Sequence, residues 1–174
     1  MKFFAGIVPP PELYNAIVNI QQQFGDNRLE PHITLRPPVN PTDETSWLYN
    51  IKTACSCFKP FTVNLPATGY FGKRVLFIGV ESEELSALYK VVKNAIKPFE
   101  PAGKQDNRPY HSHLTLGRSW CGFTKNDFDK MKVLADNLLV NQPFAFVADF
   151  VRIYHKPGGN KRYEKLEDVP LTSS

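Results

Sequence analysis

The order of elements along this chain occurs twice, and this duplication limits the folds that the chain can adopt. In each half, a strand-like and a helical segment precede the tetrapeptide His-x-Thr-Leu, and a second helical segment and a strand beginning with Pro-Phe follow it. The tetrapeptides are His32-Ile33-Thr34-Leu35 and His113-Leu114-Thr115-Leu116. Such repetition predicts two halves that close around each other, because a solenoid needs at least three repeats.

The element boundaries follow from apolar periodicity and from the prolines and glycines between segments. The predicted helices are 12–20, 42–58, 83–96 and 125–140, and the predicted strands are 2–8, 29–35, 60–65, 75–80, 110–116, 142–147 and 150–154. We expect Pro37 and Pro38 to end the second strand, because proline has no backbone N–H to donate to a sheet. The chain is expected to form one bilobed domain, with a first half at about 1–72, a second half at 73–174, and strands that are free to cross between lobes.

Length, charge and cysteine content restrict the class of protein. The 174 residues, 42% of them hydrophobic, are enough for one core, and a net charge of +4 permits an anionic substrate without marking a duplex-binding domain. The apolar run Phe3–Val8 is too short for a signal peptide or a membrane span. We therefore expect a soluble, cytoplasmic protein with no membrane association. The three cysteines lack the spacing of a zinc site or a disulfide framework.

The two tetrapeptides each place a polar face on a strand. Alternate side chains of a strand share a face, so the histidine and threonine of each copy point to one side while the aliphatic residues point into the core. If the halves pack about an approximate two-fold axis, two imidazoles and two hydroxyls meet across one groove. A single His-x-Thr in a strand is usually a structural pair, but two copies at equivalent places of a repeat, each followed by an arginine (Arg36 and Arg118), favour a shared site.

Such a set suits the cleavage of a phosphodiester. One imidazole takes a proton from the attacking water or hydroxyl while the other donates a proton to the leaving oxygen. The ordinary histidine pKa of about 6.5 lets one be neutral and the other charged near neutral pH. Threonine hydroxyls can donate hydrogen bonds to the non-bridging oxygens, where negative charge accumulates. We predict His32, Thr34, His113 and Thr115 as the catalytic set, with no metal and no cofactor.

Four further side chains are candidates for substrate binding. We expect Arg118 to share the face of His113 and to contact a phosphate or a nucleobase edge, although a surface ion pair is an alternative. Phe3, Phe71 and Tyr154 are candidates for stacking on a base.

Two other kinds of site have little support in the sequence. A zinc site formed by His111, His113 and Cys57 has no supporting spacing. The sequence also contains no Gly-rich phosphate loop and no dinucleotide fingerprint, which argues against ATP use by a P-loop route.

At the two tetrapeptides the sequence resembles the 2H phosphoesterase superfamily, whose hallmark is a pair of His-x-Thr/Ser motifs. The resemblance covers nearly the whole chain and is closest to the LigT-like or 2′-5′ RNA ligase branch, to which the segments Phe3–Ala5, Lys73–Val80, His113–Arg118 and Gly158–Glu164 are similar. It implies an α+β fold of two pseudo-symmetric lobes, each an antiparallel-type sheet with helices outside, that enclose a central groove.

The resemblance also implies an activity. Metal-independent chemistry on RNA ends or small nucleotides is implied, above all the hydrolysis of 2′,3′-cyclic phosphates. We also expect a monomer that needs no protein partner. In these roles His113 activates water, His32 protonates the leaving oxygen to give a 2′-phosphate, and Thr34 and Thr115 bind the phosphate. The segment Asn107–Ser112 departs from the usual phenylalanine-proline lead-in, which leaves the choice of substrate open.

Two alternatives remain open from the sequence. The first is a module that binds RNA ends or a nucleotide without turning them over. The second is another reaction of the same superfamily, such as cleavage of 2′-5′ oligonucleotides, trimming of RNA 3′ ends, hydrolysis of ADP-ribose cyclic phosphate, or RNA ligation. Incubation with an oligonucleotide that ends in a cyclic phosphate separates binding from turnover.

Overall fold

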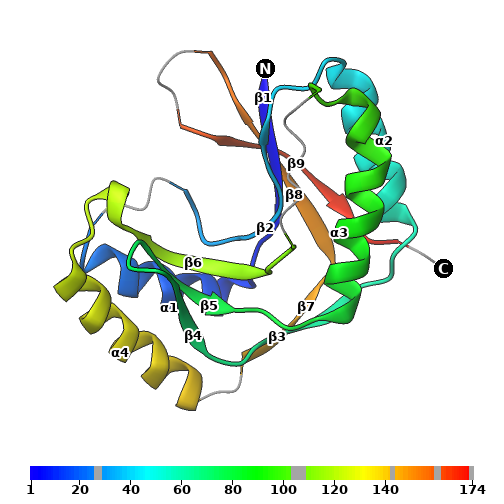
Figure 1. The fold of residues 1–174 in the computed structure, drawn as a ribbon. Coiled ribbons are helices and arrows are strands. Elements are labelled where there is room, and N and C mark those ends of the chain that lie inside the picture. The colour runs from blue at the N-terminus through cyan, green and yellow to red at the C-terminus, as the bar shows by residue number, and fades with distance from the viewer. Residues whose placement is uncertain (26–28, 103–108, 142–143, 159–161, 173–174) are drawn as a thin grey trace.

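A computed structural model of the chain gives the fold (Figure 1). The structure describes residues 1–25, 29–102, 109–141, 144–158 and 162–172. Within these ranges, no helix is both long enough and apolar enough to cross a membrane.

Helices and strands follow one another along the chain in nearly the predicted order. In chain order the elements are β1 (Lys2–Ile7), α1 (Pro11–Gln22), β2 (Ile33–Val39), α2 (Glu44–Ser56), β3 (Phe61–Leu65), β4 (Thr68–Phe71), β5 (Val75–Gly79), α3 (Glu83–Ile96), the short 3-10 helix η1 (Lys97–Phe99), β6 (His113–Arg118), a second 3-10 helix η2 (Ser119–Cys121), α4 (Lys125–Asn141), β7 (Phe144–Ala148), β8 (Phe150–Lys156) and β9 (Glu164–Pro170). The four predicted helices are confirmed to within a few residues. Strands β4 and β9 were not predicted from the sequence.

One sheet runs through both lobes. Its seven strands follow the order β4-β5-β6-β2-β1-β8-β9, all paired antiparallel, and β3 and β7 form a separate two-stranded ribbon. The predicted α+β class is confirmed. The expectation of one sheet for each lobe is corrected, because β2 and β6 join the two parts through the pair Ile33–Leu114.

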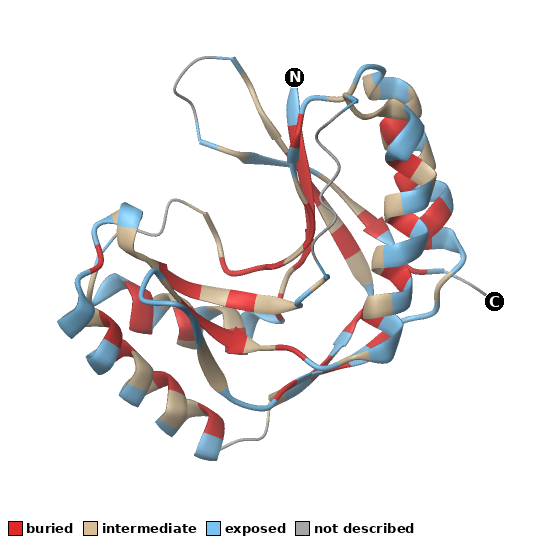
Figure 2. Cartoon of the chain, viewed as in Figure 1, coloured by how far each residue is buried: buried red, intermediate tan, exposed pale blue. Residues whose placement is uncertain are grey.

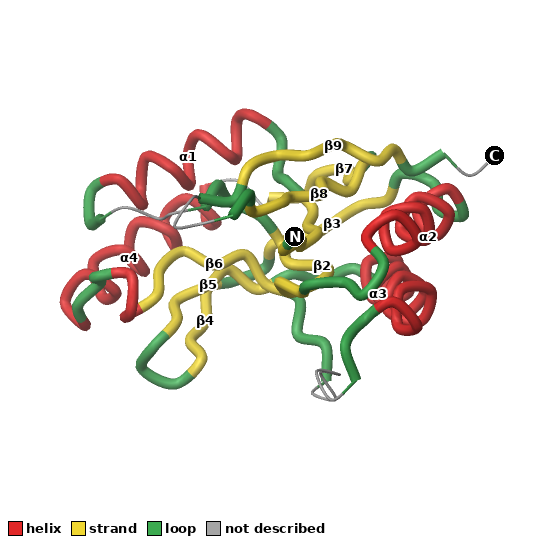
Figure 3. Tube along the Cα trace, turned by 90° about the horizontal axis from the view of Figure 1, so that it is seen from above, coloured by secondary structure: helices red, strands yellow, loops and turns green. Residues whose placement is uncertain are grey.

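The helices cover the two ends of this sheet (Figures 1 and 3). Helices α1 and α4 contact each other beside β4, β5 and β6, whereas α2 and α3 contact each other on the other side of the molecule, where α2 also contacts β9. Helix α1 therefore packs against β6 of the second half, and β8 and β9 extend the sheet of the first half. The division into duplicated halves at about residue 72 stays a prediction, and it falls in the turn between β4 and β5.

Figure 2 shows where the buried residues lie along the helices and strands, and most of the buried hydrophobic residues form one core cluster. On β1, Phe3, Ala5 and Ile7 are all at most 2% exposed and point into this core. Helix α2 begins where the Asp43 side chain accepts a hydrogen bond from the Ser46 N–H, as a helix N-cap does. The core fixes the strands that carry the histidines.

Strand β2 continues through two prolines, contrary to the prediction that they end it. Its ladder with β1 pairs Phe3 with Val39 and Ala5 with Arg36, so the register shifts across Pro37 and Pro38. Beyond Ile33, no residue of β2 pairs with β6 in the described part of the chain. The absent proline N–H groups therefore fall at an irregular part of the ladder, where proline is tolerated in a sheet.

Candidate active site

The two predicted motifs meet at the junction of the sheet. Ile33 and Leu114 face each other in the antiparallel ladder, and both are completely buried. In an antiparallel pair the flanking residues also lie opposite each other, and their side chains point to the other face. The histidine and threonine of His32–Thr34 and those of His113–Thr115 therefore surround one ladder position on one face of the sheet. The structure thus brings together the four side chains predicted to act jointly.

Each histidine is held by the same local hydrogen bond. The Nδ1 atom of His32 lies 2.7 Å from the carbonyl oxygen of Glu30, and Nδ1 of His113 lies 2.7 Å from that of His111. A carbonyl oxygen only accepts hydrogen bonds, so each Nδ1 donates and carries a proton. In both rings Nε2 is then the nitrogen that can exchange a proton with a ligand.

Both histidines are shifted toward their neutral forms. Burial, with the nearby positive charge of Arg118, lowers the pKa of His32 to about 4, although the Glu30 carbonyl and carboxylate oppose this shift. Burial also lowers the pKa of His113, again with a contribution from Arg118. His32 is 9% exposed and His113 is half-buried, so His32 is more strongly removed from water.

A β-bulge brings Arg118 to the face of the histidines. Arg118 follows Thr115 by three residues, and in a regular strand that odd separation would turn its side chain to the opposite face. The ladder with β5, however, pairs Thr115 with Phe77 and Gly117 with Leu76, which leaves Leu116 as an extra residue. The extra residue restores the shared face, in agreement with the effect of Arg118 on both histidine pKa values.

The predicted stacking residues differ in accessibility. Phe71 is 37% exposed, and its ring meets that of His113 edge-on, with centroids 4.8 Å apart. Phe3 and Tyr154 are each 2% exposed; Phe3 packs on Trp47 and Tyr154 stacks on Phe4. Neither of these two rings offers a face to a nucleobase, which removes both from the predicted binding surface and leaves Phe71.

A network that the sequence analysis missed surrounds Glu30. Its carboxylate accepts hydrogen bonds from Arg152 Nη1 at 2.9 Å and from the Tyr154 hydroxyl at 2.5 Å, and Arg152 also binds Asp168 through Nε at 2.7 Å. The residue whose carbonyl orients His32 is thus held from β8. Arg152 and Tyr154 share a strand face, but Glu30 is distant in sequence, so only tertiary structure connects them.

Side chains from elsewhere also hold the motif backbones. The Tyr110 hydroxyl donates to the Thr34 carbonyl at 3.0 Å, and the buried Gln21 amide donates to the carbonyls of Thr115 and Leu116 at 3.3 and 3.1 Å. Each threonine carbonyl therefore has a side-chain partner. Tyr110 belongs to the segment in which this chain departs from the expected lead-in.

The described residues contain no group of three or more histidine, cysteine, aspartate or glutamate side chains that could hold a metal ion. The rings of His111 and His113 lie 6.3 Å apart, whereas Cys57 lies exposed at the end of α2. Among the described residues, His111, His113 and Cys57 therefore form no ligand set for zinc.

Comparison with known proteins agrees with this geometry. The family profile of the 2′-5′ RNA ligase superfamily matches residues 9–122, so the chain belongs to this superfamily. Its membership confirms the resemblance to the 2H phosphoesterases and supports a phosphoesterase-type enzyme with phosphodiesterase or ligase-like chemistry. No curated protein matches the chain.

Solved structures share the fold over almost the whole chain. TT0787 of Thermus thermophilus is 18% identical, with a TM-score of 0.72 and 99% of each chain covered. LigT of E. coli in complex with 3′-AMP is 18% identical, with a TM-score of 0.66 over 99% of this chain and 98% of LigT. Usb1 of Kluyveromyces marxianus is 12% identical, with a TM-score of 0.50 over 98% of each chain. At these identities the likeness confirms the LigT-like fold.

Proposed function

We propose that this protein is a metal-independent phosphodiesterase that hydrolyses 2′,3′-cyclic phosphates on RNA ends or nucleotides. The observation that carries the proposal is the placement of His32 and His113 on either side of the ladder pair Ile33–Leu114, with both Nδ1 atoms donating to main-chain carbonyls. Two imidazoles with the same nitrogen left for proton exchange are what in-line displacement at phosphorus requires. Solved LigT structures contain 3′-AMP, ATP and NADP⁺, and these ligands support a nucleotide substrate here.

In the proposed reaction, water adds to phosphorus while His113 Nε2 accepts a proton from it. The bond from phosphorus to the 3′ oxygen breaks, His32 Nε2 gives its proton to that oxygen, and the product carries a 2′-phosphate. His32 must be protonated to act in this way, although burial lowers its pKa to about 4 in the empty site. A bound phosphate opposes that shift, because a nearby negative charge favours the imidazolium form.

The remaining polar groups bind the phosphate in this proposal. Thr34 and Thr115 donate hydrogen bonds to the non-bridging oxygens, and Arg118 supplies positive charge where negative charge accumulates. All three side chains are half-buried, so they remain accessible to a ligand. Glu30 acts as a positioning residue, because its carbonyl fixes the His32 ring while Arg152 and Tyr154 hold its carboxylate.

The test is the turnover of cyclic nucleotides and of RNA that ends in a 2′,3′-cyclic phosphate, with the product assigned by phosphorus NMR. We expect a 2′-phosphate product, activity that survives EDTA, and a loss of at least on the order of 10²-fold in kcat for His32→Ala and for His113→Ala. His155→Ala is the matched control, because this half-buried histidine lies on β8, where its Nδ1 faces the Met1 sulfur. Undiminished turnover by both single variants would contradict the proposal, and an unchanged RNA end that is protected by binding would identify a binding module.

A further inference from the structure

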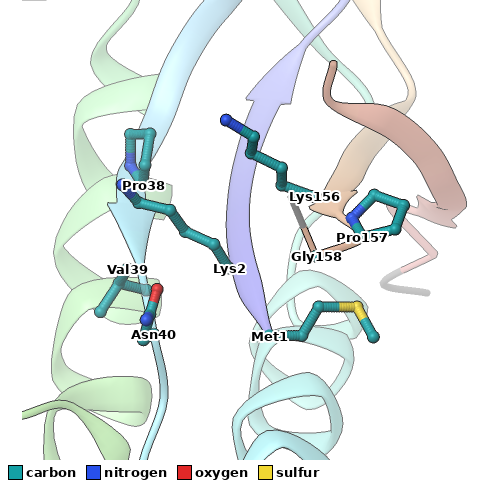
Figure 4. Close-up of a pocket in the computed structure, with 8 residues that line it drawn as sticks. All are labelled: Met1, Lys2, Pro38, Val39, Asn40, Lys156, Pro157 and Gly158. Carbon is teal, nitrogen blue, oxygen red and sulfur yellow. The ribbon is translucent and has the colours of Figure 1, made fainter. Parts of the chain in front are cut away.

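A hollow opens beside the first residues of β1, between the ends of β2 and β8 (Figure 4). Two lysines, Lys2 and Lys156, and the Asn40 amide supply its polar side chains. Pro38, Val39 and Pro157 form much of its apolar wall. Among its eight lining residues, all of them within the described part of the chain, none is acidic.

The two lysines form a pair of like charges across the sheet. Lys2 and Lys156 are direct partners in the antiparallel ladder of β1 and β8. Like charges at directly opposed positions destabilise a sheet. An anion bound between the two ammonium groups would relieve this repulsion, so the arrangement is complementary to a phosphate.

Lys2, in the wall of the hollow, lies on the same face of the sheet as His32. The β1 ladder with β8 is regular, so Lys2 shares a face with Phe4, about 7 Å along the strand. The Phe4 ring centroid is 5.2 Å from that of His32. In Figure 4 the Lys156 side chain reaches across β1, and the Lys2 side chain extends from β1 toward Pro38 on β2.

Resting on the proposed function, we propose that Lys2 and Lys156 bind a second phosphate of the substrate. The substrate is then an RNA strand of two or more nucleotides, with its terminal cyclic phosphate at the histidines and an upstream backbone phosphate in the hollow. A cyclic mononucleotide reaches the histidines but leaves the hollow empty. The apolar wall suits the sugar and base edges of the connecting nucleotide, which are less polar than its phosphate.

The experiment compares a double variant, Lys2→Gln with Lys156→Gln, with the wild-type protein. A second double variant, Lys59→Gln with Lys130→Gln, makes the same change in net charge at exposed sites that do not line the hollow. The substrates are cytidine 2′,3′-cyclic phosphate, the same nucleotide with a 5′-phosphate, and a cytidine tetranucleotide that ends in a 2′,3′-cyclic phosphate. The measurement is kcat/KM at several salt concentrations.

We expect kcat/KM for the tetranucleotide to fall on the order of 10-fold in the hollow variant and its salt dependence to become less steep by about one. Both values should stay near wild type for the cyclic mononucleotide and for the control variant. Equal losses on mononucleotide and tetranucleotide, or no loss on either, would overturn the inference while the proposed function stands. Equal losses on the 5′-phosphorylated nucleotide and the tetranucleotide would overturn the assignment to an RNA strand.

Failure of the proposed function has a different signature. The wild-type protein would then hydrolyse none of the three substrates. Binding of a labelled tetranucleotide with a 3′-phosphate, measured by fluorescence anisotropy, still tests the hollow. Weaker binding by the hollow variant than by the control variant supports the second phosphate position, and equal binding overturns it.

Discussion

The two copies of the motif share a β-bulge but use the arginine that follows in opposite ways. In the first copy, Thr34 pairs with Gly6 and Arg36 with Ala5, so Leu35 is the extra residue; Leu116 is extra at the equivalent place of the second copy. Arg36 comes two residues after Thr34, whereas Arg118 comes three residues after Thr115. With one bulge in each strand, these spacings send the two side chains to opposite faces.

The consequence is a buried ion pair in one copy and an accessible charge in the other. Arg36 is 7% exposed, and its Nε donates to the Glu100 carboxylate at 2.6 Å. Arg118 is half-buried near both histidines. The second motif has one more residue between threonine and arginine than the first. This difference in spacing makes Arg36 a buried structural cation and leaves Arg118 accessible to a substrate. The two motifs thus share the positions of their histidines and threonines, whereas the arginines that follow them have different surroundings.

Loss of the Arg36 guanidinium should destabilise the fold more than any other change considered below. Arg36→Gln leaves the Glu100 carboxylate buried with its main cation gone, which typically costs about 3–5 kcal/mol of unfolding free energy. Arg118→Gln should change stability little and lower kcat/KM by on the order of 10-fold or more. Urea unfolding and steady-state kinetics of both variants check this. A stable Arg36 variant with impaired kcat would show that the two arginines are not divided in this way.

The next effect concerns the difference in burial between the two histidines. The pKa of His32 is lowered to about 4 in the folded protein. Between pH 6.5 and pH 4, His32 is therefore protonated in the unfolded chain but neutral in the folded protein. Folding stability is then lost as the pH falls through this window, by about 2 kcal/mol between pH 7 and pH 5. The pKa of His113 is lowered less, so its contribution should be smaller.

The measurement is the difference in unfolding free energy between pH 7 and pH 5 for wild type, His32→Gln and His113→Gln. Removing His32 should flatten the pH dependence more than removing His113, because other titrating groups cancel in the comparison. Equal slopes for the two variants would show that the histidines are equally removed from water.

The third prediction concerns the hydrogen-bond network of Glu30, which orients His32. Glu30→Gln loosens the hold of Arg152 and Tyr154 on the carbonyl that orients His32, so kcat should fall on the order of 10-fold with KM unchanged. The Glu30 carboxylate also raises the His32 pKa, so the variant should shift the His32 limb of the pH profile to lower pH. The control is Glu167→Gln. Glu167 lies on β9, and its substitution breaks an ion pair with Lys52 on α2. A lower kcat with an unshifted pH profile would assign Glu30 a role in folding alone.

The parts of the site that the sequence predicted are those set by strand alternation. Placing His32 and Thr34 on one face and Ile33 in the core needs only the period of two. The bulges at Leu35 and Leu116 depend on the register with neighbouring strands, which no local pattern encodes. Tyr154 was expected to stack on a base, yet its hydroxyl partner, Glu30, comes from a distant loop, and that contact places the ring in the interior.

The smallest expected losses of unfolding free energy concern Tyr110 and Gln21, whose side chains donate hydrogen bonds to the backbone carbonyls of the two motifs. Tyr110→Phe removes the hydrogen bond to the Thr34 carbonyl but keeps the ring stacked on Tyr89, with centroids 3.9 Å apart, so it should cost about 1 kcal/mol of unfolding free energy. Gln21→Met leaves the carbonyls of Thr115 and Leu116 without their buried donor and should cost somewhat more, about 1–3 kcal/mol.

Urea unfolding of both variants, with the exposed Tyr49→Phe as a control, measures the difference. A larger loss for Tyr110→Phe than for Gln21→Met would place the tighter restraint on the first motif. Because β2 and β6 join through the pair Ile33–Leu114, either variant should also raise hydrogen exchange at that junction before it affects the outer strands.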